Sequence, residues 1–199
     1  PVHAFVQFVS NAARVGFAFH HVDFRLLLPL ICGSVLGAAI GSQAVGVVSF
    51  AVLPAIAGLI IVLVVWLPHD RFIPKGRAAT FALGAYQTGL GMVAGATGPL
   101  GAVVLNRMNT EREWLVVNTG VYMTINHGVR SVAFGLLGFA FHAWWLTIAV
   151  MSFGVILGAW LGTRLRQYVP QTNYETVFKW VVTALALRLV ILTVLEIKA

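Results

Sequence analysis

The sequence predicts an all-α polytopic membrane protein, and three observations support this fold class. Hydrophobic residues make up 59% of the 199-residue chain and charged residues only 10%, whereas a soluble domain has about 25% charged residues. The mean hydropathy is +0.90. Residues 26–69 and 131–163 contain no Asp, Glu, Lys or Arg, and each stretch is longer than the roughly 20 residues that cross a bilayer.

These apolar stretches predict about six spanning helices, each of roughly 20 residues. The helices are expected at about residues 3–20, 24–42, 46–67, 113–140, 144–163 and 175–195. The first uncharged stretch is long enough for two helices, and Ser42-Gln43 divides it. A charged loop is expected at 69–77.

The segment 79–105 differs from the others because it is rich in glycine. It contains Gly84, Gly89, Gly91, Gly95 and Gly98, followed by Pro99. An interior Gly costs about 1 kcal/mol and Pro about 3 kcal/mol relative to Ala in a helix, so a break is expected before Pro99, which suits the first position of a new helix. The N–H groups of Leu100, Gly101 and Ala102 would then point toward the break and form an anion site.

Three features of the chain recur in the same order. GFAFH occurs at 16–20 and 138–142, beside an Asn/Arg pair and a stripe of three glycines at four-residue spacing. The pairs and stripes are Asn11, Arg14, Gly33, Gly37 and Gly41 in one copy, and Asn126, Arg130, Gly154, Gly158 and Gly162 in the other. A stripe alone indicates close helix packing, but the repeated order indicates two homologous halves, as in many secondary transporters.

The two halves are assigned to residues 1–68 and 79–199, with 69–78 as the connecting loop. The glycine-rich segment opens the second half, and its counterpart in the first half would precede residue 1. Either the chain has lost that element or it begins just after it.

The basic loop residues indicate how the segment 79–105 enters the membrane. If the segment 79–105 returns to the side of the membrane from which it entered, all the basic loop residues lie on that side. The loops near 43 and 143, which contain no Lys or Arg, then lie on the other side. These basic residues are Arg25, Arg71, Lys75, Arg77, Arg107, Arg112, Arg164 and Arg166. The positive-inside rule favours this arrangement, which predicts a re-entrant segment and inverted halves.

Two arginines lie inside predicted spans, where a guanidinium is expensive and usually faces the bundle interior. Arg14 shares a helix face with Asn11, and Arg130 shares one with Asn126. Arg14 is about six residues from its predicted helix end, so snorkelling to the headgroups is an alternative for it. Arg130 is deeper and is the stronger candidate for binding a ligand.

Several other functions are disfavoured by the sequence. The net charge of +7 is spread over short loops and does not form the basic stripe of a nucleic-acid-binding protein. Cys32 is the single cysteine, and no His/Cys/Asp/Glu cluster has metal-ligand spacing, so no cofactor is expected. A membrane-embedded redox, haem or metal protein using His127 and His142 remains an alternative, as does a passive anion channel.

The chain resembles the sulfite exporter TauE/SafE family of membrane permeases. The matching stretches are GLGMVAGATGPLGAVVLN at 89–106, the Asn/Arg segment through Arg130, and GVILGAWLGTRL at 154–165 with its echo CGSVLGAAIG at 32–41. The resemblance implies two related halves, no enzymatic activity, and transport of sulfite, sulfonates or other small anions across the bacterial cytoplasmic membrane. The family's first glycine-rich segment has no match in this chain, and GATGP stands where many members have more glycine.

The expected function is therefore secondary transport of a small anion by a protein embedded in the lipid bilayer. A homo-oligomer is left open. The expected substrate-binding residues are Arg130, Asn126, Gly95, Thr97, Gly98, Pro99, Leu100, Gly101, Arg14, Asn11 and Gln87.

Overall fold

The computed structural model describes residues 1–45, 62, 76–94, 99–106, 108–165, 168, 180, 183–184, 187–188 and 191. Every regular element in this part of the chain is helical, which confirms the all-α prediction. Most of the helices expected at 46–67 and 175–195, most of the loop at 69–77, and Gly95, Thr97 and Gly98 lie outside the described residues.

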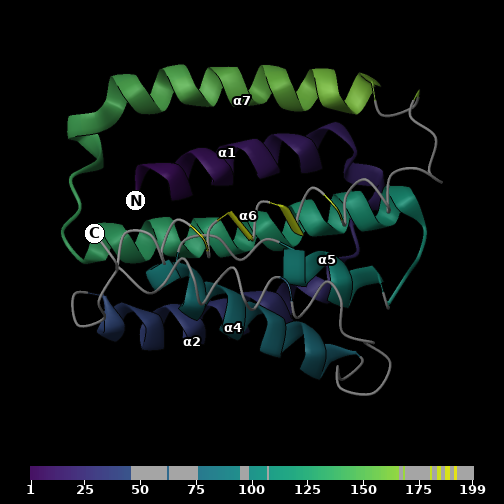
Figure 1. Cartoon of the computed structure of the whole chain (residues 1–199), viewed down its shortest axis with the longest axis horizontal. Coiled ribbons are helices and arrows are strands. Elements are labelled where there is room, and N and C mark those ends of the chain that lie inside the picture. Colours follow the sequence, from purple (N-terminus) through teal and green to yellow (C-terminus); the bar gives the residue numbers. More distant parts are fainter. Residues whose placement is uncertain are drawn as a thin grey trace.

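The described helices follow the predicted order (Figure 1). They are α1 (Val2–Phe17), η1 (Phe19–His21), η2 (Phe24–Leu26), α2 (Leu27–Ala44), α4 (Arg77–Ala94), α5 (Pro99–Asn106), α6 (Arg112–Leu136), η3 (Phe141–Trp144) and α7 (Trp145–Leu165). The expectation that one helix extends to residue 140 is wrong, because α6 ends at Leu136 and Gly138 takes a left-handed φ of 90°. That conformation costs glycine little and suits the end of a helix.

The first predicted helix also ends early, at Phe17 rather than near residue 20. The reason is a clamp on the connection between α1 and α2. The Asn118 side chain, on α6, donates to the His21 carbonyl and accepts from the Asp23 N–H, both at 2.8 Å. Asp23 Oδ1 in turn accepts from the Arg25 N–H at 3.0 Å.

The glycine stripe of α2 is a packing face against α4. A Cβ added to Gly33, Gly37 or Gly41 would overlap the backbone of Phe81, Ala85 or Gly89, respectively. Each advance of four residues along α2 is matched by an advance of four residues along α4, so the two helices run in the same direction. Small residues permit this backbone approach, and the packing interpretation is confirmed for this stripe.

The second stripe has a different environment. Gly154, Gly158 and Gly162 on α7 are exposed, and a Cβ at any of them would meet no atom within 4 Å. In the described part of the chain α7 packs beside α1 at the edge of the helical array (Figure 1). The two stripes therefore repeat in sequence, but only the stripe on α2 is packed against another described helix.

The glycine-rich segment is broken and folds back on itself. Its first helix, α4, ends at Ala94, and α5 begins at Pro99, the predicted start. The far end of α5 returns to the first turn of α4, since Thr80 Oγ1 lies 4.0 Å from Met108 Sδ. Val104 and Leu105 of α5 join the apolar cluster of Leu26, Leu30, Ala79, Leu83 and Tyr122.

The helix directions bring four basic residues to one end of the helical array. The clamp at Asn118 places the start of α6 beside the connection between α1 and α2, and α7 runs back alongside α1 from the far end of α6 (Figure 1). Arg25, Arg77, Arg112 and Arg164 define this arginine end. At the opposite end, residues 43–45 and 137–144 contain neither Lys nor Arg.

Two helical stretches in the described part are long and apolar enough to cross a membrane, Phe24–Ala44 and Phe141–Leu165. Large apolar side chains are exposed on the outside of the array, among them Ile40 at 62% and Phe153 at 66%. Such a continuous apolar surface is expected to face lipid. The total of six spans stays a prediction, because α1, α4 and α6 contain polar residues and α5 has only eight residues.

Candidate functional site

Six buried polar side chains on α4 and α6 are here called the polar cluster. Its members are Gln87, Thr88, Asn126, His127, Arg130 and Ser131. Asn126 and Arg130 are one helical turn apart and share a face of α6, and the exposed fraction of Arg130 is only 5%. The polar cluster contains one cation, Arg130, and five side chains that are neutral or can be neutral. This composition favours a negatively charged ligand.

A hydrogen bond fixes the register of α6 on α4 within the polar cluster. Asn126 Nδ2 donates to Thr88 Oγ1 over 3.1 Å, and both side chains are fully or almost fully buried. Gln87, the neighbour of Thr88, is 2% exposed, and its Oε1 is buried without a hydrogen-bond partner among the described residues. Two predicted site residues, Asn126 and Arg130, therefore both lie against α4, at Thr88 and Gly91, respectively.

Gly91 makes room for the Arg130 guanidinium against the backbone of α4. A Cβ at Gly91 would lie 3.0 Å from Arg130 Nη1 and 3.2 Å from Cζ, closer than ordinary van der Waals contact. Gly91 also follows Gln87 by one helical turn, so both belong to the face that meets the polar cluster. The sequence analysis counted Gly91 only as a helix-weakening glycine; its spacing from Gln87 was the signal that could have identified it.

The first helix contributes a second imidazole to this region. His127 on α6 is 6% exposed, and its ring centroid lies 6.2 Å from that of His3 on α1, edge to face at 81°. Ser131 Oγ donates to the His127 carbonyl at 2.8 Å. His3 and Thr88 are not among the residues predicted from the sequence, and their signal lies in the contacts between helices.

The start of α5 lies against α6, one turn before Asn126. Gly101 is buried, and a Cβ there would overlap the ring of Tyr122, four residues before Asn126. Pro99 and Leu100 form the first turn of α5, as predicted. The predicted helix start therefore lies about 12 Å along α6 from the level of Arg130, at 1.5 Å per residue.

Comparison with known proteins identifies the family of this chain. The family model for TauE, sulfite exporter TauE/SafE, matches residues 1–189. The chain belongs to the sulfite exporter TauE/SafE family. No curated protein and no solved structure gave a significant match. Members of this family are membrane permeases, not enzymes, so the TauE/SafE chain is an integral membrane protein of a transporter family.

The other arginine predicted for the site lies elsewhere in this TauE/SafE protein. Arg14 Cδ lies 3.7 Å from the position of a Cβ added to Gly120 of α6. Gly120 is ten residues before Arg130, so Arg14 meets α6 at a level about 15 Å along the helix axis from Arg130. Asn11, on the same helix, is buried and donates to the Gln7 carbonyl at 2.7 Å. Arg14 and Asn11 thus line the α1–α6 contact, and their role in substrate binding stays a prediction.

The histidines of the redox alternative occupy different environments. His127 is buried, whereas His142 lies in η3 and is exposed. Within the described ranges, no group of three or more His, Cys, Asp or Glu residues is placed to hold a metal ion.

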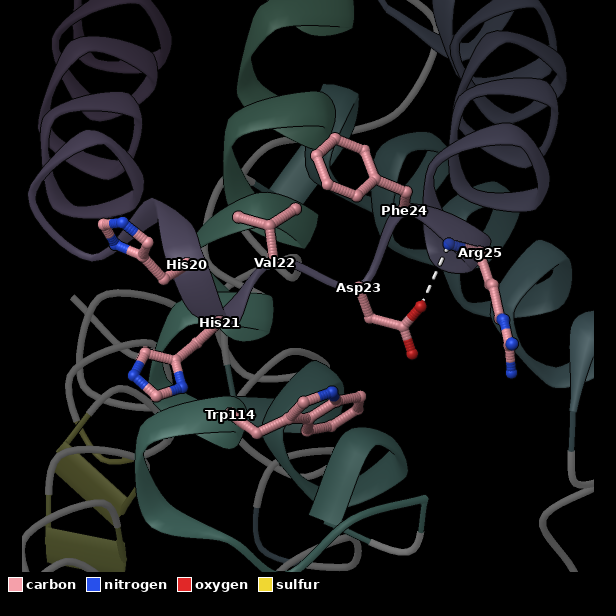
Figure 2. A pocket seen from close by; sticks show the side chains of 7 residues that line it. All are labelled: His20, His21, Val22, Asp23, Phe24, Arg25 and Trp114. Atoms are coloured by element: carbon pink, nitrogen blue, oxygen red, sulfur yellow. Dashed lines mark hydrogen bonds between the residues drawn. The ribbon is translucent and has the colours of Figure 1, made fainter.

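An open hollow of about 430 Å³ lies at the arginine end of the TauE/SafE protein (Figure 2). It is lined by the α1–α2 connection and Trp114 of α6. Its side chains have mixed charge, with the Asp23 carboxylate close to the Arg25 backbone. Because it contains this carboxylate, the hollow selects a small anion less well than the polar cluster does.

Proposed function

We propose that this TauE/SafE protein is a multi-pass permease of the bacterial cytoplasmic membrane that transports sulfite, a sulfonate or a similar small anion. The observation that carries the proposal is the burial of Arg130 in the polar cluster, between Gly91 and the Asn126–Thr88 hydrogen bond. Ionisable groups inside membrane proteins are expensive and typically lie on substrate paths. An anion bound beside Arg130 would offset its charge.

The donor set of the polar cluster suits a small oxyanion. A guanidinium presents a planar fork that matches two oxygens of a sulfite, sulfonate or carboxylate group. The amides of Gln87 and Asn126 and the hydroxyl of Thr88 add neutral donors on the facing helices. Asn126 and Thr88 already bond to each other. Without an anion they hold α6 and α4 in position, and they can also contact the anion when it binds.

The helix directions support inverted halves. The repeat aligns α1 with α6 and α2 with α7, and within each pair the two helices run in opposite directions. Inverted repeats commonly place the substrate site at their interface, near the middle of the membrane. The edge-to-face contact of His3 with His127 is a contact between a helix of the first half and a helix of the second. By the positive-inside rule the arginine end would be cytoplasmic.

The test is anion binding and flux with matched arginine variants. Purified protein is screened with sulfite, sulfate, methanesulfonate and acetate by thermal shift and calorimetry, and flux is then measured in proteoliposomes. Arg130→Gln removes one or more charge-assisted hydrogen bonds worth about 1.5–3 kcal/mol each, so affinity should fall tenfold to more than a hundredfold. Arg164→Gln, on the exposed end of α7, is the control and should bind as the parent does.

Two outcomes separate the proposal from its alternatives. Equal binding by folded Arg130→Gln and Arg164→Gln proteins would remove the polar cluster from the transport path. Flux that rises without saturation would indicate a passive channel, whereas saturable flux supports a carrier.

A further inference from the structure

His127 is a buried titratable group that an anion site alone does not require. It lies three residues before Arg130 on α6, is 6% exposed, and its Nδ1 has no hydrogen-bond partner among the described residues. Leaving a buried polar atom unpaired costs about 1–3 kcal/mol. Such atoms in a native interior call for a physical explanation.

The charges around His127 come from two of the helices packed there. On α6 itself the nearest charge is Arg130, and Tyr122 lies five residues toward the arginine end. On α1 the facing group is His3. On α4, Gln87 and Thr88 are neutral and Tyr86 is the titratable side chain, while α2 faces the interior with Ser34. Among these named groups of the described helices, a proton on His127 would meet like charge or neutral side chains.

His3 connects this buried imidazole to the outside of the described array. It is exposed, lies in the first turn of α1 at the end opposite the arginine end, and contacts the His127 ring edge to face. Its Nε2 also lies 3.4 Å from Gln7 Nε2. Histidine exchanges protons readily between about pH 5 and 8, so the exposed His3 is placed to exchange protons with water beside the buried His127.

We propose that His127 binds a proton together with the transported anion, which makes the protein a proton–anion symporter; this inference rests on the anion site proposed above. In the empty site a second positive charge one turn from Arg130, with Cβ atoms about 5–6 Å apart, is unfavourable. A monoanion between the two side chains removes that penalty, so proton and anion each favour binding of the other by the same factor. One proton passes from water through His3 to a nitrogen of His127 and leaves with the anion, and no covalent bond of the anion changes.

The experiment uses methanesulfonate, which remains a monoanion throughout the pH range of histidine. Its dissociation constant is measured by calorimetry between about pH 5 and 8, in pairs of buffers with different ionisation heats. The parent should take up close to one proton per anion at the upper end of this range. Its affinity should then rise by up to tenfold for each pH unit of acidification.

Matched histidine variants locate the proton. His127→Gln should abolish both the proton uptake that accompanies anion binding and the pH dependence of the dissociation constant. His142→Gln, exposed in η3, should behave as the parent does. His3→Gln should keep the pH dependence of binding but slow proton-driven methanesulfonate uptake into proteoliposomes.

Each failure has a distinct meaning. Saturable binding by the parent without proton uptake would overturn proton coupling and leave the anion site standing, and this measurement needs no variant to fold. Proton uptake that persists in His127→Gln would assign the proton to another group and overturn the role of His127. A parent that binds neither methanesulfonate nor sulfite would overturn both the anion site and the coupling.

Discussion

The contact between Gly91 and Arg130 gives a test in which binding and stability should change in opposite directions. In Gly91→Ala the new Cβ would lie 3.0, 3.2 and 3.4 Å from Nη1, Cζ and Cδ of Arg130. Carbon–carbon contacts are optimal at about 3.5–4.0 Å, so the guanidinium must move by roughly 0.5 Å. The backbone of α4 need not move, because the nearest atoms belong to a flexible side chain.

The size of each effect follows from this displacement. A misplacement of about 1 Å can cost a hundredfold where geometry is critical, so half that distance should weaken anion binding about tenfold, or ~1.4 kcal/mol. The same substitution removes an interior glycine from α4, which favours the helix by up to about 1 kcal/mol. Gly91→Ala should therefore be at least as stable as the parent and bind the anion less tightly.

The assay is calorimetry with sulfite or methanesulfonate, together with the thermal unfolding midpoint in the same detergent. Gly154→Ala is the matched control, since a Cβ there meets no atom within 4 Å, and it should leave affinity unchanged. A Gly91→Ala protein that binds as tightly as the parent would show that the position of the guanidinium does not set affinity. A parallel loss of stability and binding would mean that Gly91 is needed for packing alone.

Three further predictions concern the fold. Single cysteines at 76 and 109 in a Cys32→Ala background should label from the same side of the membrane, because α5 returns to the end where α4 begins; labelling from opposite sides would exclude a re-entrant segment. Gly37→Leu should prevent assembly of α2 on α4, whereas Gly158→Leu on exposed α7 should express and unfold normally, and equal yields in size-exclusion chromatography would contradict this. Asn118→Ala loses the side-chain hydrogen bonds to His21, Asp23 and Trp114, worth about 1 kcal/mol each, so its unfolding midpoint should fall.

The glycine-rich segment shows what the sequence can predict about this fold. Helix propensity places a break before Pro99, and the charge distribution over the loops favours a segment that returns to its own side. Both arise from local composition, and both agree with the observed ends of α4 and α5. The end of α6 was missed because GFAFH reads as apolar helix, while Gly138 adopts a left-handed conformation that the pattern does not reveal.

The polar cluster was predicted only in part, for a different physical reason. Arg130 and Asn126 are predicted from the sequence of α6 alone, and Gln87 is predicted from the composition of α4 alone. Gly91, Thr88 and His3 depend on the register between helices that are distant in sequence. Register between packed helices is set by side-chain ridges and grooves on both partners, and one helix's sequence does not contain it.

The repeat makes the same point about symmetry. Arg14 and Arg130 occupy matching places in the sequence order, yet they contact α6 and α4 at levels about 15 Å apart. The stripe on α2 meets Ala85 and Gly89, small residues that admit its backbone, whereas the stripe on α7 faces no described helix. A sequence motif therefore specifies the shape of one helix face, whereas the helix packed against that face determines whether it is buried and which residues it contacts. Among the described residues, the glycine-rich α4 packs against α2 of the first half and α6 of the second, and the two contacts differ in chemistry. The contact with α2 is made by small residues and backbone, whereas the contact with α6 contains Arg130 and the Asn126–Thr88 hydrogen bond, and α1 adds the imidazole of His3 beside His127.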